Sequence, residues 1–138
     1  MEGLSAALKV AASGLDSQST RLRVVSENLA NAQSTSSIPG GQPYQRQTVV
    51  FEALLDGQSG ATQTRVASIL GDTKPFPIEF NPGHQAADAD GYVKMPNVNM
   101  LVEMADMREA NRSYEANLQV FKQARELITM TIDLLRNR

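Results

Sequence analysis

The sequence predicts a mainly α fold, in which long N- and C-terminal helices form a coiled-coil-like hairpin with a small irregular β insert between them. The first observation is the placement of helix breakers, since all six prolines and seven of the nine glycines lie within residues 34–96. The other two are apolar rows with seven-residue spacing on either side of that segment. We therefore assign residues 1–33 to the N-terminal helix and 97–138 to the C-terminal helix of one inner helical domain, and 34–96 to a loop and β-rich insert.

The N-terminal helix is predicted by a leucine at every seventh position. This row is Leu8, Leu15, Leu22 and Leu29. The positions four residues earlier complete a heptad seam with one polar member, and they are Leu4, Ala11, Gln18 and Val25. Small residues surround Gly14, which costs up to about 1 kcal/mol relative to alanine inside a helix. This glycine indicates either fraying or a close contact with another helix.

The C-terminal helix follows Pro96, and either Asn97 or Asn99 can cap its first turn. One row of large side chains repeats every seven residues and comprises Met100, Met107, Tyr114, Phe121, Ile128 and Leu135. The companion row is expected four residues after each, at Met104, Asn111, Leu118, Arg125 and Ile132. The acids Glu103, Asp106, Glu109 and Glu115 are expected to form a solvated or subunit-facing charged surface.

The apolar seams of the two helices are the candidate assembly surface. The residues that we assign to it are Leu8, Leu15, Leu22, Leu29, Met100, Met107, Tyr114, Leu118, Phe121, Ile128 and Leu135. Further apolar positions lie off these seams, and neighbouring subunits are one natural cover for them. They are Val10, Val24, Leu101, Val102, Val120, Leu127, Met130 and Leu134. The alternative is an ordinary helical hairpin that packs on its own β insert, and the periodicity favours neither.

The insert is predicted to contain turns and short strands. Residues 44–51 and 64–70 are strand candidates, separated by Gly-containing turn signals. Phe76, Ile78 and Phe80 alternate with Pro77 and Glu79, which predicts a half-buried strand that proline keeps at a sheet edge.

The residues offer no catalytic, metal or cofactor site, so we do not expect an enzyme. The single histidine, His84, lies in a loop context in which side chains usually form local hydrogen bonds. Asp88-Ala89-Asp90-Gly91 has two of the ligands of a calcium loop but neither the third nor the closing glutamate, and a turn is the better interpretation.

The charge pattern narrows the class of partner. Thirteen basic against fifteen acidic residues give a net charge of −2 with no basic stripe, so we expect no nucleic-acid partner. The longest uncharged stretch, residues 28–45, is polar, which excludes a membrane span there. The acidic start and Lys9 argue against a cleaved secretory signal. The absence of cysteine excludes disulfides.

Several motifs occur in a fixed order along the chain. Ser13-Gly14-Leu15 is followed by Asn28-Leu29-Ala30-Asn31, where the two asparagines lie on one face at the predicted helix end. Gly41-Gln42-Pro43-Tyr44 leads into Val49-Val50-Phe51, and Asn81-Pro82-Gly83-His84 precedes Asp90-Gly91-Tyr92-Val93 and Pro96-Asn97-Val98-Asn99. Glu103-Met104 through Arg112-Ser113-Tyr114-Glu115-Ala116-Asn117 closes the series. In this order the motifs resemble the axial proteins of the bacterial flagellum, and within them the basal-body rod family.

The loop after the first motif departs from the wider rod pattern. Many rod and hook relatives close that motif with Thr, one residue, Gly and an aromatic residue, whereas here Thr35 is followed by Ser36-Ser37-Ile38 and the aromatic Tyr44 comes later. The longer loop is similar to the proximal rod branch and argues against distal rod and hook relatives.

The resemblance implies a structural subunit of the flagellar basal-body rod, which crosses the periplasm. Its implied partners are further copies of itself and other rod subunits in a helical polymer, the membrane ring, rod-base adaptor proteins, and the flagellar type III export apparatus. The resemblance further implies that the terminal helices form an inner layer around a central channel, with the insert outside. A soluble coiled-coil adaptor and a different rod subunit are the alternatives.

Overall fold

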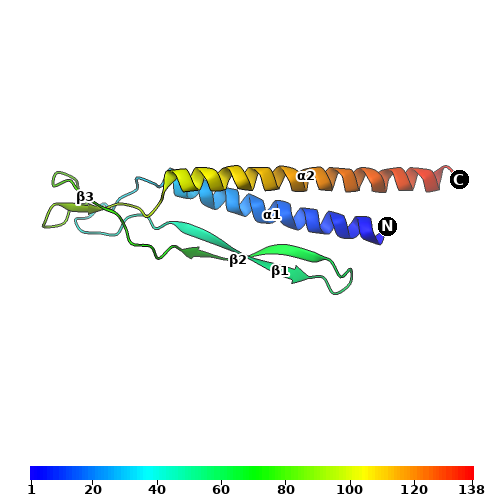
Figure 1. Ribbon diagram of the computed structural model, residues 1–138, viewed down its shortest axis with the longest axis horizontal. Coiled ribbons are helices and arrows are strands. Elements are labelled where there is room, and N and C mark those ends of the chain that lie inside the picture. The colour runs from blue at the N-terminus through cyan, green and yellow to red at the C-terminus, as the bar shows by residue number, and fades with distance from the viewer. The chain divides into compact units, whose positions relative to one another are not determined.

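The computed structural model describes all residues from Met1 to Arg138 and contains two long helices and four strands (Figure 1). In chain order these elements are α1 (Glu2–Ala30), β1 (Gln47–Leu55), β2 (Thr62–Gly71), β3 (Ile78–Phe80), β4 (Tyr92–Lys94) and α2 (Met100–Arg136). The strands form two separate two-stranded sheets, β1 with β2 and β3 with β4. The predicted mainly helical fold with a small sheet insert is therefore confirmed.

The ends of both helices follow from local sequence. Asn99 caps α2, because its Oδ1 accepts hydrogen bonds from the backbone N–H groups of Leu101, at 3.1 Å, and Val102, at 3.4 Å. Asn97, the other predicted cap, is used elsewhere. Helix α1 ends at Ala30, and the following turn is closed by Asn31, whose Nδ2 donates to the carbonyl of Glu27 at 2.8 Å.

The chain divides into two compact units, and both long helices and both long strands contribute to each. Unit 1 comprises Met1–Leu22, Val50–Ser68 and Arg108–Arg138. Unit 2 comprises Arg23–Val49 and Ile69–Met107.

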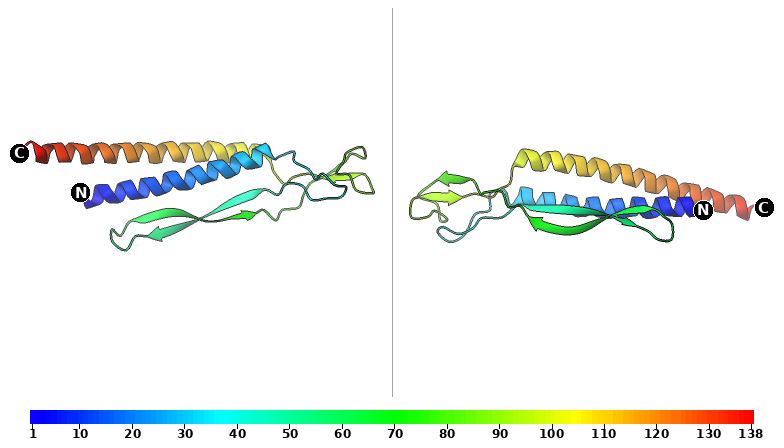
Figure 2. Two further views of the ribbon diagram at one scale, coloured as in Figure 1. Left: turned by 180° about the vertical axis from the view of Figure 1, so that it is seen from behind. Right: turned by 60° about the horizontal axis from the view of Figure 1, so that its bottom comes forward.

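In unit 1, α1 packs between α2 and the β1–β2 hairpin, as Figure 1 and the left view of Figure 2 show. On the hairpin side, the hydroxyl of Ser17 donates to the carbonyl of Thr64 at 3.0 Å, and the backbone N–H of Thr64 donates to Ser13 Oγ at 3.2 Å. On the opposite side, the Asn117 amide of α2 lies against Gly14. The small residues of α1 therefore allow contacts on two faces.

In unit 2, the β3–β4 sheet pairs Ile78 with Lys94, Glu79 with Val93, and Phe80 with Tyr92 in antiparallel register. Val93 is buried, whereas Ile78 is 66% and Phe80 64% exposed. The expectation of a half-buried strand was wrong for β3. This strand has only one partner, β4, and the buried side chain of the sheet, Val93, belongs to β4. The turn before β4 is confirmed: Asp88 Oδ1 accepts hydrogen bonds from the N–H groups of Asp90 and Tyr92.

The two longer strands lie close to their predicted positions. Strand β2 contains all of the expected residues 64–70. Strand β1 starts at Gln47 rather than at Tyr44. Residues Tyr44 to Arg46 instead belong to a network of side-chain contacts, described below.

The inward rows of α1 match the heptad prediction more closely than those of α2. Leu8, Leu15, Leu22 and Leu29 are all half-buried, and Ala11 and Val25 are buried. On α2 the half-buried members of the predicted row are Met107, Tyr114, Phe121 and Ile128, while Met100 and Leu135 are exposed.

The predicted companion row of α2 is mostly exposed in the single chain. Met104 and Ile132 are more than half exposed, and of that row only Leu118 is half-buried. The row four residues before Met107, Tyr114, Phe121 and Ile128 faces inward instead, with Glu103, Ala110 and Ala124 buried and Asn117 half-buried. Its small and polar side chains leave room for a close partner helix.

Candidate functional site

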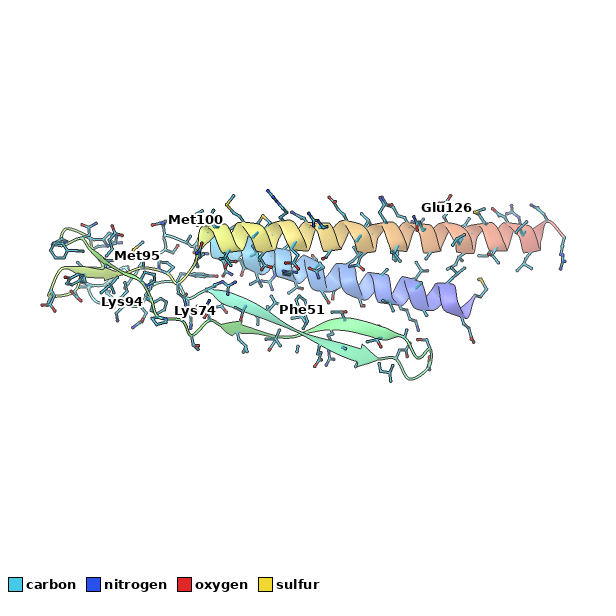
Figure 3. All side chains as sticks on the ribbon, viewed as in Figure 1. Phe51, Lys74, Lys94, Met95, Met100 and Glu126 are labelled. Atoms are coloured by element: carbon cyan, nitrogen blue, oxygen red, sulfur yellow. The ribbon has the colours of Figure 1, made fainter.

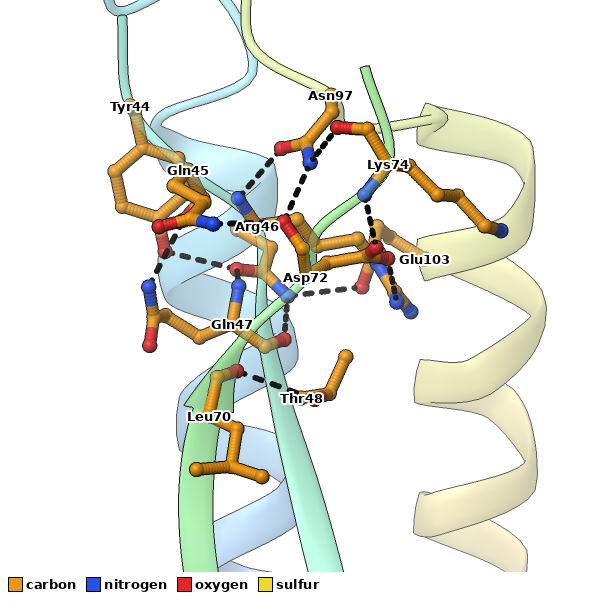
Figure 4. A network of polar contacts seen from close by, with 11 residues as sticks. Tyr44, Gln45, Arg46, Gln47, Thr48, Leu70, Asp72, Lys74, Asn97 and Glu103 are labelled. Carbon is orange, nitrogen blue, oxygen red and sulfur yellow. Dashed lines mark hydrogen bonds and ion pairs between the residues drawn. The ribbon is translucent and has the colours of Figure 1, made fainter. Parts of the chain in front are cut away.

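Unit 2 contains a polar cluster that we call the Glu103 cluster. Its members come from the end of α1, the segment leading into β1, the exit of β2, the loop before α2 and the first turn of α2 (Figure 4). They are Asn28, Tyr44, Arg46, Asp72, Asn97 and Glu103.

Glu103 and Arg46 form the charged centre of this cluster. The Glu103 side chain is fully buried, and its Oε1 accepts from Arg46 Nε. Arg46 Nη1 donates to Asp72 Oδ2 at 3.1 Å. The expectation that Glu103 belongs to a solvated acidic surface was therefore wrong. Glu103 can be buried because Arg46, 57 residues earlier in the chain, pairs with its carboxylate. No local sequence pattern reveals this pair.

Asn28 connects α1 to this charged centre and uses its full hydrogen-bonding capacity. Its Nδ2 donates to the carbonyl of Gln47 at 2.8 Å and to Glu103 Oε2 at 3.3 Å. Its Oδ1 accepts from the Tyr44 hydroxyl at 2.8 Å and from the Gln47 N–H at 2.9 Å. Two donors and two acceptor sites are all that an asparagine amide offers. Asn28 therefore links helix, loop and strand within its own chain.

Asn97 closes the other side of the cluster. Its Oδ1 accepts from the Arg46 backbone N–H at 2.7 Å, and its Nδ2 donates to the carbonyls of Asp72 and Lys74, both at 3.0 Å. Every buried side-chain polar atom of the protein has a hydrogen-bond partner. A fully satisfied network of this kind fixes the arrangement of the segments that meet in it.

The titration behaviour of the cluster follows from these contacts. Burial lowers the pKa of the Arg46 guanidinium, but the hydrogen bonds and charges of Glu103 and Asp72 outweigh it, so the pKa lies above its usual value. The backbone N–H of Lys74 lowers the pKa of Asp72, and Arg46 lowers it further, against the effect of burial. Burial raises the pKa of Tyr44, as do the charges of Glu27 and Glu103, which keeps its hydroxyl a donor.

Most of the motif residues from the sequence have one of two structural roles. Contacts between elements are made by Ser13, Gly14, Asn28, Tyr44 and Asn97. Local turns and caps are made by Asn31, which also accepts from the Ser34 hydroxyl, and by Asn99. Pro96 is buried, Leu15, Leu29 and Val98 are half-buried, and Ala30 is exposed.

A second candidate site is the apolar surface of α2, which the chain itself leaves uncovered. Figure 3 shows side chains projecting from this helix along its length, Met100 and Glu126 among them. The exposed large apolar residues of α2 are Met100, Leu101, Val102, Met104, Val120, Leu127, Met130, Ile132, Leu134 and Leu135. We call Val120, Leu127, Met130 and Leu134 the outer stripe, because they share one face of the helix beside the inward rows.

Other features lack the chemistry of a reactive centre. His84 Nδ1 accepts from the backbone N–H of Ala86 at 3.0 Å, the loop role that its context predicts. No group of three or more metal-ligating side chains is present. Neither helix combines the length and the apolar character that a membrane crossing requires.

Comparison with known proteins identifies the family. A profile described as flagella basal body rod protein matches residues 8–36, which include Gly14 and Asn28. A second, described as flagellar basal body rod FlgEFG protein C-terminal, matches residues 89–134, which include Glu103 and Asn117. The two matched segments are therefore the ones that contact each other through these residues in the two units.

Curated relatives match nearly the whole chain and carry the name flagellar basal-body rod protein FlgC. The relative from Agrobacterium fabrum is 59% identical over 99% of this chain and 98% of its own length. The relatives from Yersinia enterocolitica and Borreliella burgdorferi are 42% and 36% identical, over 91% and 97% of this chain and 92% and 99% of their own lengths. This family consists of structural proteins rather than enzymes, as the sequence predicts. The chain belongs to the FlgC family of flagellar basal-body rod proteins.

Proposed function

We propose that the chain is a structural subunit of the proximal rod of the flagellar basal body. It polymerises helically with further copies and with other rod subunits, and the polymer transmits motor torque across the periplasm. The family of its relatives supports the rod assignment. The proposed partners also include the membrane ring and rod-base adaptor proteins at the ends of the polymer, and the flagellar type III export apparatus.

The observation that carries the proposal is the uncovered apolar surface of α2. Leu127, Met130 and Leu134 are between 49% and 74% exposed, although they lie on a 37-residue helix with a separate inward face. A contiguous exposed apolar stripe of this kind marks a protein interface. Val120, Leu127 and Leu134 repeat every seven residues, which is the spacing that another helix can cover. We therefore propose coiled-coil-like packing of α2 against neighbouring subunits.

Polar residues on another face of α2 supply further directional contacts to neighbours. Asn111 and Arg125 are exposed on α2 and are available for bonds to a neighbour, whereas Asn28 has no remaining donor or acceptor. The exposed methionines Met100 and Met104 suit contacts with non-identical subunits, because thioether side chains adapt to irregular surfaces.

The test replaces an exposed residue so that the fold of the single chain is unaffected. Leu127→Asp, alone and with Leu134→Asp, should prevent incorporation into basal bodies and abolish swimming in a strain that lacks the native copy. Gln119→Asp, which adds the same charge at an exposed polar position of the same helix, is the matched control. Electron microscopy of purified basal bodies measures the outcome.

Two results would contradict the proposal. Intact rods and normal swimming with both leucines replaced would show that the outer stripe is not an assembly surface. A deletion strain with intact basal bodies, together with a discrete soluble oligomer of the purified chain, would favour the coiled-coil adaptor.

A further inference from the structure

Within unit 1, the side-chain amide of Asn117 on α2 packs directly against Gly14 of α1. A Cβ atom placed on Gly14 would lie 2.6 Å from Asn117 Nδ2 and 2.7 Å from both Cγ and Oδ1. Because all three amide atoms are equally close, the plane of the amide covers the bare Cα. The fit therefore depends on the absence of a side chain at position 14.

The Asn117 amide is held in place from its own helix. Its Nδ2 donates to the carbonyl of Ser113, one turn earlier, at 3.0 Å. The contact with Gly14 is thus steric, and a side chain at position 14 would either break the hydrogen bond from this amide to Ser113 or push α2 away.

Gly14 lowers the stability of α1 as a helix, so a glycine at this position needs a compensating reason such as this contact. Inside a helix, glycine is about 1 kcal/mol less favourable than alanine. The other glycine of α1, Gly3, has open space around the position of its Cβ, with nothing within 4 Å. The two glycines of one helix therefore differ in the feature that matters, and Gly3 is an internal control for Gly14.

The position of the contact along the two helices matches a second contact in unit 2. Asn28 lies 14 residues after Gly14 on α1, and its partner Glu103 lies 14 residues before Asn117 on α2. Fourteen residues are two heptads on each helix. In unit 1, the Arg21–Glu109 ion pair falls between these positions and runs in the same antiparallel sense. Each contact therefore specifies, within its own unit, the same antiparallel pairing of the α1 and α2 sequences.

We propose that Gly14 and Asn117 form a steric register key, a positioning pair that sets the axial alignment of α1 and α2 needed for incorporation into the rod. This inference rests on the proposed structural role in the rod. The inference gives two motifs, Ser13-Gly14-Leu15 and Glu115-Ala116-Asn117, a role within one subunit. They contact each other and thereby set the axial position of the outer stripe of α2 relative to the part of α1 in unit 1.

The experiment is a double-mutant cycle in the source bacterium, with the native gene replaced by each variant. Gly14→Ala should reduce swimming and basal-body incorporation by at least about tenfold, because overpacking a close contact displaces one helix from the other. Asn117→Ala removes the projection and should have a smaller effect. The combination Gly14→Ala with Asn117→Ala should recover to the level of Asn117→Ala alone. Gly3→Ala should match the native chain.

Export is measured beside assembly, as the amount of chain that leaves the cytoplasm. We expect all four variants to be exported within about twofold of the native chain, since the key acts on the folded subunit. If Gly14→Ala merely prevented folding without involving Asn117, the double variant would remain defective, and that result would overturn the inference. Gly14→Ala behaving like Gly3→Ala would overturn it as well. A deletion strain that swims normally would instead remove the proposed function and leave the contact itself intact.

Discussion

The contacts that stabilise unit 1 internally differ in kind from those that stabilise unit 2. Unit 2 has a fully buried glutamate, an arginine shared between two carboxylates, and an asparagine that uses every donor and acceptor it has. Unit 1 is held by small residues between helices and hairpin and by solvent-exposed ion pairs such as Glu52–Arg65. Unit 1 also carries the outer stripe of α2, whose side chains are between 48% and 74% exposed.

This difference indicates that the two units depend on different interactions for their stability. Buried, fully hydrogen-bonded networks are directional, so the Glu103 cluster fixes how the segments of unit 2 that contribute to it meet. Exposed apolar faces gain stability only when another surface covers them. Both units expose large apolar residues, Leu101 and Phe80 in unit 2 among them, so the difference between the units lies in the buried polar network that only unit 2 has.

The largest effect should come from removing the cation of the Glu103 cluster. Arg46→Ala leaves Glu103 buried without its ion pair, which should cost about 3–5 kcal/mol of unfolding free energy. The matched change in unit 1 is Arg65→Ala, where the ion pair is exposed and should contribute about 0.2–1 kcal/mol. Urea unfolding of the purified chain, followed by circular dichroism and by amide hydrogen exchange of each unit, measures both. Equal costs for the two variants would remove the contrast between the units.

A smaller effect is expected from the two asparagines of the first motif. Asn28→Ala leaves the Tyr44 hydroxyl and the Gln47 N–H without their acceptor in a buried site, at a cost of about 1–3 kcal/mol. Asn31→Ala removes only contacts within one helical turn and should cost less than about 1 kcal/mol. The same unfolding experiment separates them. A larger loss for Asn31→Ala would show that the motif stabilises the turn rather than the cluster.

The smallest effect concerns acid stability. The pKa of Asp72 is lower in the folded chain than its usual 3.8, so its contribution is complete above about pH 4 and is lost as the pH falls through the folded value. Asp72→Asn should therefore flatten the loss of stability of unit 2 below pH 4. The pKa of Asp56 in the unit 1 hairpin is lowered as well, first through Ser59. Its cation, Lys9, is half exposed and lies 3.6 Å away, so Asp56→Asn should change the acid profile less. Acid titration followed by circular dichroism compares the two variants, and identical profiles would contradict this order.

The sequence predicts the features that depend on local spacing. Proline and glycine placement separates the helices from the insert, the Asn99 cap follows from its position before the helix, and heptad spacing finds the inward row from Met107 to Ile128. The turn at Asp88 was also predictable, because its side chain bonds only to groups within four residues.

The features that could not be predicted depend on partners distant in the sequence. Seven-residue spacing put Met104 and Ile132 in the companion row, but the row of α2 that contacts α1 contains Glu103 and Asn117, since α1 offers polar and small partners there. The burial of Glu103 depends on Arg46, whose own segment looks like the start of a strand. Hydrophobic periodicity cannot find such pairs, because it assigns every polar residue to the solvent-facing side, including one that is buried with a partner.

The attachment of α1 to the hairpin affects how the sheet can grow. Ser13 and Ser17 occupy both backbone groups of Thr64, as the main chain of a third strand would. Edge strands with free backbone groups are templates for further strand addition and for fibril formation. Two serine hydroxyls one helical turn apart therefore act as a stop at this point of β2. A protein that is proposed to polymerise through its helices thereby blocks, at this residue, the competing route to a β-sheet fibre.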